Sequence, residues 1–132
     1  MNLDKLLKKI ELNKNTANEQ KTYPLKIGGE TYEVKTMTRD KKREFFYMNE
    51  IGQKDIKIGD IVKKSIPFIY SSLNLAPLAE RAKQDKLIVK YHDIVELLFE
   101  PDEIVQIIAF MMEINGISEK QTDEDVEAIK KQ

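Results

Sequence analysis

The sequence has no cysteine, no tryptophan and a single histidine, His92. Without cysteine the chain can form no disulfide bond, no thiolate nucleophile and no cysteine-ligated zinc site, a usage that suits a reducing cytoplasm. A lone histidine between Tyr91 and Asp93 is typical of a surface or helix-capping position, because a general base works with a nucleophile and an orienting group. These absences exclude several kinds of catalytic centre.

Long hydrophobic segments and phosphate-binding motifs are missing as well. The longest apolar run, Ile107–Met112, is far shorter than the ~20 residues of a membrane-spanning helix. The N-terminal sequence, MNLDKLLKKIEL, mixes charges with apolar residues and does not read as a signal peptide. The pair Gly28-Gly29 lacks the spacing and the following Lys-Ser/Thr of a phosphate-binding loop. We therefore expect no membrane partner, no cofactor, no metal site and no enzymatic activity.

Length and charge bound the fold and its partners. The chain has 132 residues, of which 41% are hydrophobic and 34% charged, and its formal net charge is −1. One domain is expected at this length. A chain of this size buries about 68% of its unfolded surface, which is enough for a core without disulfide bonds or a structural metal ion. The near-neutral charge argues against a general nucleic-acid binder, although the basic run Arg39–Arg43 can form a local patch.

The most apolar stretch, Glu100–Gly116, predicts a helix around which the rest of the chain packs. Pro101 suits the first helical position, and Gly116 can adopt the left-handed conformation that ends a helix. Only Gln106 and Glu113 are polar within the apolar part, so we expect burial on nearly all sides. The carboxylates at its start are explained by the helix dipole rather than by a cation site.

Residues 2–12 predict an amphipathic helix. Its apolar side chains recur at i, i+3, i+4 and i+7 and are Leu3, Leu6, Leu7 and Ile10, here named the N-terminal stripe. A helix this short is marginal alone in water, so it must dock on its own domain or on another chain. Both alternatives stay open, because the polar residues 13–21, NKNTANEQK, indicate a flexible linker.

Residues 22–35 predict a β-hairpin, with apolar residues alternating on both sides of Gly28-Gly29. Two glycines allow the positive φ angles of a tight turn. Pro24 lacks an N–H and marks the first strand as an edge. The apolar face must cover a helix or join a larger sheet, and an uncovered edge allows pairing with a second copy in a dimer or ring.

Further helices follow the hairpin. Thr38 is expected to cap one that ends at Gly52, and Asp60 to cap a third, which Pro67 should kink or split after Ser65.

Two short segments come before the most apolar helix. Leu87–Val89 is predicted to be either a short buried strand or part of a helix, because periodicity cannot distinguish the two over so few residues. Asp93–Phe99 predicts a helix with Ile94, Leu97 and Leu98 turned inward.

These elements predict an α+β fold that is mainly α. A short N-terminal β-hairpin is followed by a compact bundle of about four to six helices, in a single domain of residues 1–132. Residues 22–117 form the folded core, and the acidic residues 118–132 form a frayed helix or a disordered tail.

The order of elements resembles a known family. A tyrosine-bearing hairpin, YPLKIGGETYEVKTMT, leads directly into a charged helix, RDKKREFFYMNEIG, and the last apolar helix, PDEIVQIIAFMMEINGIS, precedes an acidic tail. Over residues 22–120 this order resembles the tail assembly chaperones of long-tailed bacteriophages and prophages. The helix and linker before it resemble the N-terminal segment of some prophage members. The lysine-rich composition is compatible with a Gram-positive host.

The resemblance implies a non-enzymatic protein of the host-cell cytoplasm that binds the tape measure protein and helps to recruit tail tube subunits. The family supplies no residue motif for binding. A client of amphipathic helices fits an apolar groove or a detachable amphipathic helix, and methionine and aromatic side chains adapt to imperfect sites. The candidate partner-binding residues are therefore Leu3, Leu6, Leu7, Ile10, Phe110, Met111 and Met112.

Two other functions stay as alternatives. One is another small phage structural protein, such as a head–tail adaptor, which would be found in purified particles. The other is a nucleic-acid-binding regulator that uses the Arg39–Arg43 helix, and its binding would weaken with salt.

Overall fold

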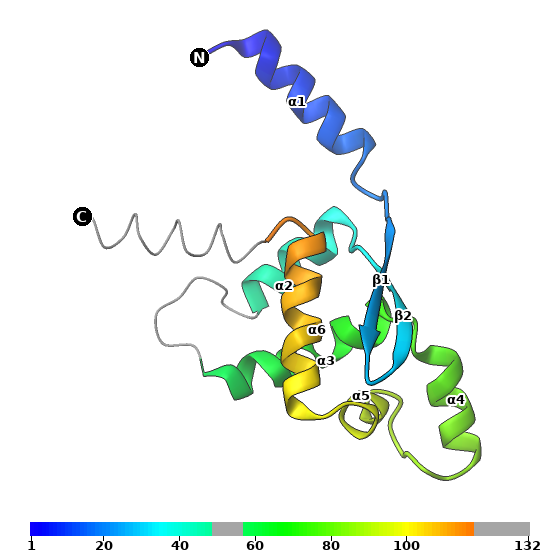
Figure 1. Ribbon diagram of the computed structural model, residues 1–132. Coiled ribbons are helices and arrows are strands. Elements are labelled where there is room, and N and C mark those ends of the chain that lie inside the picture. Colours follow the sequence, from blue (N-terminus) through cyan, green and yellow to red (C-terminus); the bar gives the residue numbers. More distant parts are fainter. Residues whose placement is uncertain (49–56, 118–132) are drawn as a thin grey trace.

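The structure, a computed structural model, describes residues 1–48 and 57–117 (Figure 1). Within these residues the chain forms six helices and a two-stranded antiparallel sheet. In chain order the elements are α1 (Leu3–Asn15), β1 (Thr22–Ile27), β2 (Glu30–Lys35), α2 (Arg39–Met48), α3 (Ile58–Ser72), α4 (Ala76–Gln84), α5 (Asp93–Leu98) and α6 (Pro101–Ile114). The predicted α+β, mainly α fold is confirmed, since five helices follow the hairpin. The predicted helix end at Gly52 and the acidic residues 118–132 lie outside the described residues.

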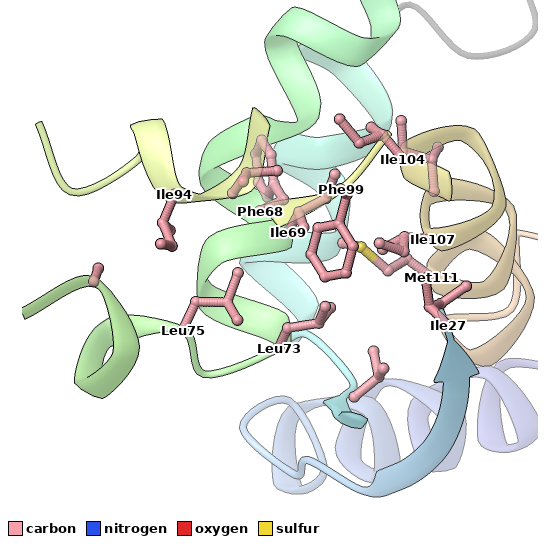
Figure 2. Packing of buried hydrophobic residues seen from close by; sticks show 14 of the residues in the cluster. Ile27, Phe68, Ile69, Leu73, Leu75, Ile94, Phe99, Ile104, Ile107 and Met111 are labelled. Atoms are coloured by element: carbon pink, nitrogen blue, oxygen red, sulfur yellow. The ribbon is translucent and has the colours of Figure 1, made fainter. Parts of the chain in front are cut away.

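The centre of the core is one face of α6. Its buried side chains are spaced i, i+3, i+4 and i+7 and are Ile104, Ile107, Ile108 and Met111. Figure 2 shows Ile107 and Met111 pointing from α6 toward Phe99 and Ile69. Burial on nearly all sides was expected, but Val105 on another side is 42% exposed. The reason is that the main contacts of α6 come from α3 and β1, which cover a single face.

The predicted ends of α6 are confirmed. Pro101 is its first residue, and the backbone N–H of Glu100 donates a hydrogen bond of 2.9 Å to the Glu103 carboxylate. Gly116 follows the helix with a φ angle of +80°.

A buried amide ties the end of α6 to the segment after β2. The Asn115 side chain is 3% exposed, and its Oδ1 accepts a hydrogen bond of 2.8 Å from the backbone N–H of Met37. Its Nδ2 donates a bond of 2.7 Å to the carbonyl of Met111. The polar group is satisfied on both sides, as burial requires.

The hairpin has the predicted two-residue turn. Gly28 and Gly29 have φ angles of +60° and +85°, which fit a turn with two left-handed residues. Ile27 and Val34 are buried on the face that packs on the helices, and the Tyr32 ring meets the Phe99 ring edge-on at 5.3 Å. Of the two expected arrangements, the hairpin covers a helix, and the described sheet has two strands.

One hairpin edge is interrupted. Ile27 and Glu30 flank the two-residue turn and form a hydrogen-bonded pair. Hydrogen-bonded and non-hydrogen-bonded pairs alternate along the two strands from that point. Pro24, opposite Glu33, therefore falls in a non-hydrogen-bonded pair. The proline nitrogen therefore faces away from β2, where no N–H is needed. Pairing of a hairpin edge with a second copy stays a prediction.

The helix starts and breaks after the hairpin were predicted in part. Thr38 Oγ1 accepts a hydrogen bond of 3.4 Å from the backbone N–H three residues later, as a cap does. Asp60 lies in the first turn of α3 rather than at its cap. Pro67 does not split α3, which runs through it without a break at Ser65. Because Pro67 has no N–H, the carbonyl of Lys63 lacks its usual helical hydrogen-bond donor. Lys63 and Pro67 are both exposed, so water can solvate that carbonyl.

Two short segments differ from expectation. Leu87–Val89 is neither strand nor helix but a bent, irregular segment, in which only Ile88 is buried. In α5, Ile94 and Val95 are buried, whereas Leu97 is 68% exposed. Six residues make less than two helical turns, so the sequence period gives the inward direction poorly.

Candidate protein-binding surface

The N-terminal stripe lies on the part of α1, Leu3–Leu12, whose residues are all exposed. Figure 1 shows α1 extending away from the body, and none of its residues is buried. The exposed fractions of the stripe are 63% for Leu3, 40% for Leu6, 62% for Leu7 and 62% for Ile10. The two predicted alternatives were docking of the stripe on its own domain and docking on another chain. In the described residues the stripe is not docked on its own domain. Among the residues that the structure describes, none covers the stripe, which is an exposed apolar surface.

Local interactions form α1 in the absence of packing. Asn2 Oδ1 accepts a hydrogen bond of 3.1 Å from the backbone N–H of Lys5, which caps the first turn. At the other end, Thr16 Oγ1 donates a bond of 2.9 Å to the Leu12 carbonyl. Such caps contribute about 1 kcal/mol each, and a helix of 13 residues stays marginal without a partner.

The segment after α1 is held by hydrogen bonds, although the sequence indicated a flexible linker. The helix also runs three residues further than predicted, to Asn15. Lys21 N–H donates to Thr36 Oγ1 at 2.8 Å, and Thr36 N–H donates to the Lys21 carbonyl at 2.8 Å. Gln20 Nε2 donates to the Thr36 carbonyl at 2.9 Å. These bonds attach the segment that follows α1 to the residue that follows β2.

Of the second predicted set of binding residues, one lies in the core and two lie against it. Met111 is fully buried, and Phe110 and Met112 are half-buried against the core. This corrects the expectation for Met111, because its side chain packs inside the domain and is not open to a partner. The structure does not bring α1 and this side of α6 together (Figure 1).

A hollow of about 330 Å³ lies where α1 meets α2. It is lined by Asn13 of α1, by Thr16 and Ala17 just after α1, and by Arg39, Lys42 and Arg43 of α2. The Ala17 carbonyl accepts a hydrogen bond of 2.8 Å from the backbone N–H of Arg39, which ties the segment after α1 to the first residue of α2. Glu19 is the one carboxylate in the lining. We name this feature the cationic hollow.

The three cations of the hollow form no ion pair with another described residue. In residues 1–48 and 57–117 the ion pairs are Lys41 with Glu44 and Arg81 with Asp85, and neither includes a cation of the hollow. The sequence showed the basic run, but only the structure shows which of its members face one hollow.

Beyond the hollow, α2 presents aromatic rings to solvent. Phe46 is 36% and Tyr47 69% exposed, and their ring centroids lie 5.7 Å apart. Of the three aromatic residues of α2 only Phe45 lies in the core, where its ring centroid is 5.1 Å from that of Phe68. Basic and aromatic side chains thus share the outer face of α2.

His92 and Tyr32 each pack against another aromatic ring. The His92 ring lies 4.7 Å from the Tyr70 ring at the start of α5, beside a second hollow of about 330 Å³ between α2 and α3. Burial, with Glu30 and Glu103 nearby, raises the pKa of Tyr32, whose ring packs on the core. The described residues contain no group of three side chains that could hold a metal ion.

No helix in the described ranges is long and apolar enough to span a bilayer. Known protein families, curated proteins and solved structures were each compared with the chain, and none of them matches it.

Proposed function

We propose that the protein is a non-enzymatic phage tail assembly chaperone of the host-cell cytoplasm. In this proposal the N-terminal stripe binds amphipathic helices of the tape measure protein, and the complex helps to recruit tail tube subunits. The observation that supports it is the exposure of four large apolar side chains on one face of α1, of which none is buried. An exposed apolar helix face is typical of a helix-binding surface.

The size of the stripe fits weak and reversible binding. Full burial of a leucine or isoleucine side chain contributes about 1.5–3 kcal/mol. Four such side chains contribute about 6–12 kcal/mol at most, which lies within the estimated cost of association, about 4–15 kcal/mol, and leaves little surplus for binding. An assembly chaperone has to release its client as the tail forms, and a low affinity per contact suits that role.

Co-expression tests the proposal. The tape measure protein of the same prophage is expected to be mostly insoluble alone and soluble with this chain. Leu7→Gln should lower the soluble fraction, because it places an amide in the apolar face. Leu12→Gln is the matched control, since Leu12 is 61% exposed but lies on the opposite side of α1. No rescue by the unaltered chain would reject the proposal.

The outer face of α2 favours one second candidate, a nucleic-acid-binding regulator. Exposed aromatic rings beside basic side chains are typical of single-strand binding. The net charge of −1 speaks against it. Gel shifts with single- and double-stranded oligonucleotides at low salt distinguish the two functions, since the chaperone proposal expects no shift.

A further inference from the structure

The N-terminal stripe leads into the cationic hollow. Leu6, Ile10 and Asn13 of α1 are spaced i, i+4 and i+7, so they follow one line along the helix. Asn13, at the end of this line, also lines the hollow. The apolar surface of α1 and the cationic surface of the hollow are therefore adjacent at the C-terminal end of α1.

The charge in the hollow comes from side chains rather than from free backbone donors. Three of the first four N–H groups of α2 are already bonded. That of Arg39 donates to the Ala17 carbonyl and that of Lys42 to the Thr38 carbonyl, both at 2.8 Å, and that of Lys41 donates to Thr38 Oγ1 at 3.4 Å. The guanidinium and ammonium groups of Arg39, Lys42 and Arg43 have no carboxylate within ion-pair distance in the described chain. A partner that brings carboxylates to this point gains charge pairs that the free protein lacks.

Together these features indicate the chemistry of the partner. We propose that α1 and the cationic hollow bind one amphipathic helix whose apolar stripe ends in a cluster of two or three acidic residues. The inference rests on the proposed function and specifies which helices of a client are recognised. Since α1 has 13 residues, at ~1.5 Å per residue the helix it covers is ~20 Å long.

A helical peptide fits this surface better than a polyanion does. Four apolar side chains approach the hollow along α1, and they need an apolar cover that a phosphate backbone does not provide. Glu19 at the rim and the net charge of −1 both disfavour a long run of phosphates. Carboxylates at one end of an apolar helix place negative charge only where the cations lie.

Peptide binding to the full chain tests the inference. The probes are helical peptides of about 14 residues with one leucine stripe, carrying either three glutamates or three glutamines in a terminal turn. A second pair has these residues in the opposite terminal turn, so that both directions of binding are sampled. Fluorescence anisotropy at low salt should show one glutamate peptide binding about 5–20-fold tighter than its glutamine counterpart, as expected for three exposed charge pairs.

Matched charge variants locate the effect. Arg39→Gln with Lys42→Gln and Arg43→Gln should remove the glutamate advantage and leave the glutamine peptide unaffected. Lys26→Gln with Lys63→Gln and Lys64→Gln changes the net charge equally at exposed positions and should retain the advantage. Circular dichroism and thermal melts check that both variants are folded. High salt should reduce the advantage, because exposed pairs are screened.

The outcomes separate this inference from the proposed function. Equal affinity for glutamate and glutamine peptides, or equal losses in the two charge variants, would overturn the inference. If Leu7→Gln still weakens both peptides while Leu12→Gln does not, helix binding by the stripe would stand. Competition of a single-stranded oligonucleotide with the glutamate peptide would also overturn the inference, in favour of phosphate binding in the hollow.

Discussion

The two most informative helices, α1 and α6, have the same kind of sequence and opposite environments. Each has an apolar face spaced i, i+3, i+4 and i+7, and each has a hydrogen-bonded first turn. The face of α6 is buried by α3 and the hairpin, whereas the face of α1 has no cover in the described chain. Periodicity therefore identifies the face that needs a cover, but not what provides it. For α1 we propose that a client helix provides it.

Truncation of one isoleucine in each helix gives the largest contrast. Ile107→Ala removes a fully buried side chain and should lower the free energy of unfolding by about 2–5 kcal/mol. Ile10→Ala removes a side chain that is 62% exposed and should change it by less than about 0.5 kcal/mol. Urea unfolding followed by circular dichroism measures both. A comparable loss in Ile10→Ala would mean that α1 is covered in solution, by its own body or by a second copy.

What the sequence predicted well is what local chemistry determines. The hairpin followed from Gly28-Gly29 between alternating residues, and the ends of α6 followed from Pro101 and Gly116. The hydrogen bonds of Thr36 were missed because they join residues 15 or 16 positions apart, which no periodicity reports. The same holds for the cationic hollow, which depends on how the end of α1 meets α2.

The buried amide at the end of α6 gives the next effect in size. Asn115→Ala leaves the backbone N–H of Met37 and the carbonyl of Met111 without their side-chain partner. A buried polar group left unsatisfied costs about 1–3 kcal/mol, so the unfolding midpoint should fall clearly. Asn18→Ala, at an exposed position outside the core, is the control. Equal midpoints for the two variants would show that the fold does not depend on this link.

A smaller effect is expected from the hydrogen bonds that attach the segment after α1 to Thr36. Thr36→Val removes the hydroxyl that accepts the Lys21 N–H and keeps the shape of the side chain. The loss of one hydrogen bond should cost about 0.5–1.5 kcal/mol. Amide hydrogen exchange should become faster at Lys21 and stay unchanged in the buried part of α6. Unchanged exchange at Lys21 would mean that the remaining bonds hold this segment by themselves.

The smallest effect concerns the pH dependence of the hairpin's packing on the body. Burial raises the pKa of Tyr32 above its ordinary value, and the charges of Glu30 and Glu103 act in the same direction. The stabilisation from the neutral phenol is fully present below the unfolded-state pKa of about 10 and is lost as the pH rises through the higher folded-state value. Tyr32→Phe keeps the ring beside Phe99, so its stability should fall less than that of the unaltered chain above pH ~10. Urea unfolding at neutral and alkaline pH measures the difference, and parallel curves would show that Tyr32 ionises equally in both states. Because Tyr32 is only half-buried, the effect should be well below that of Ile107→Ala.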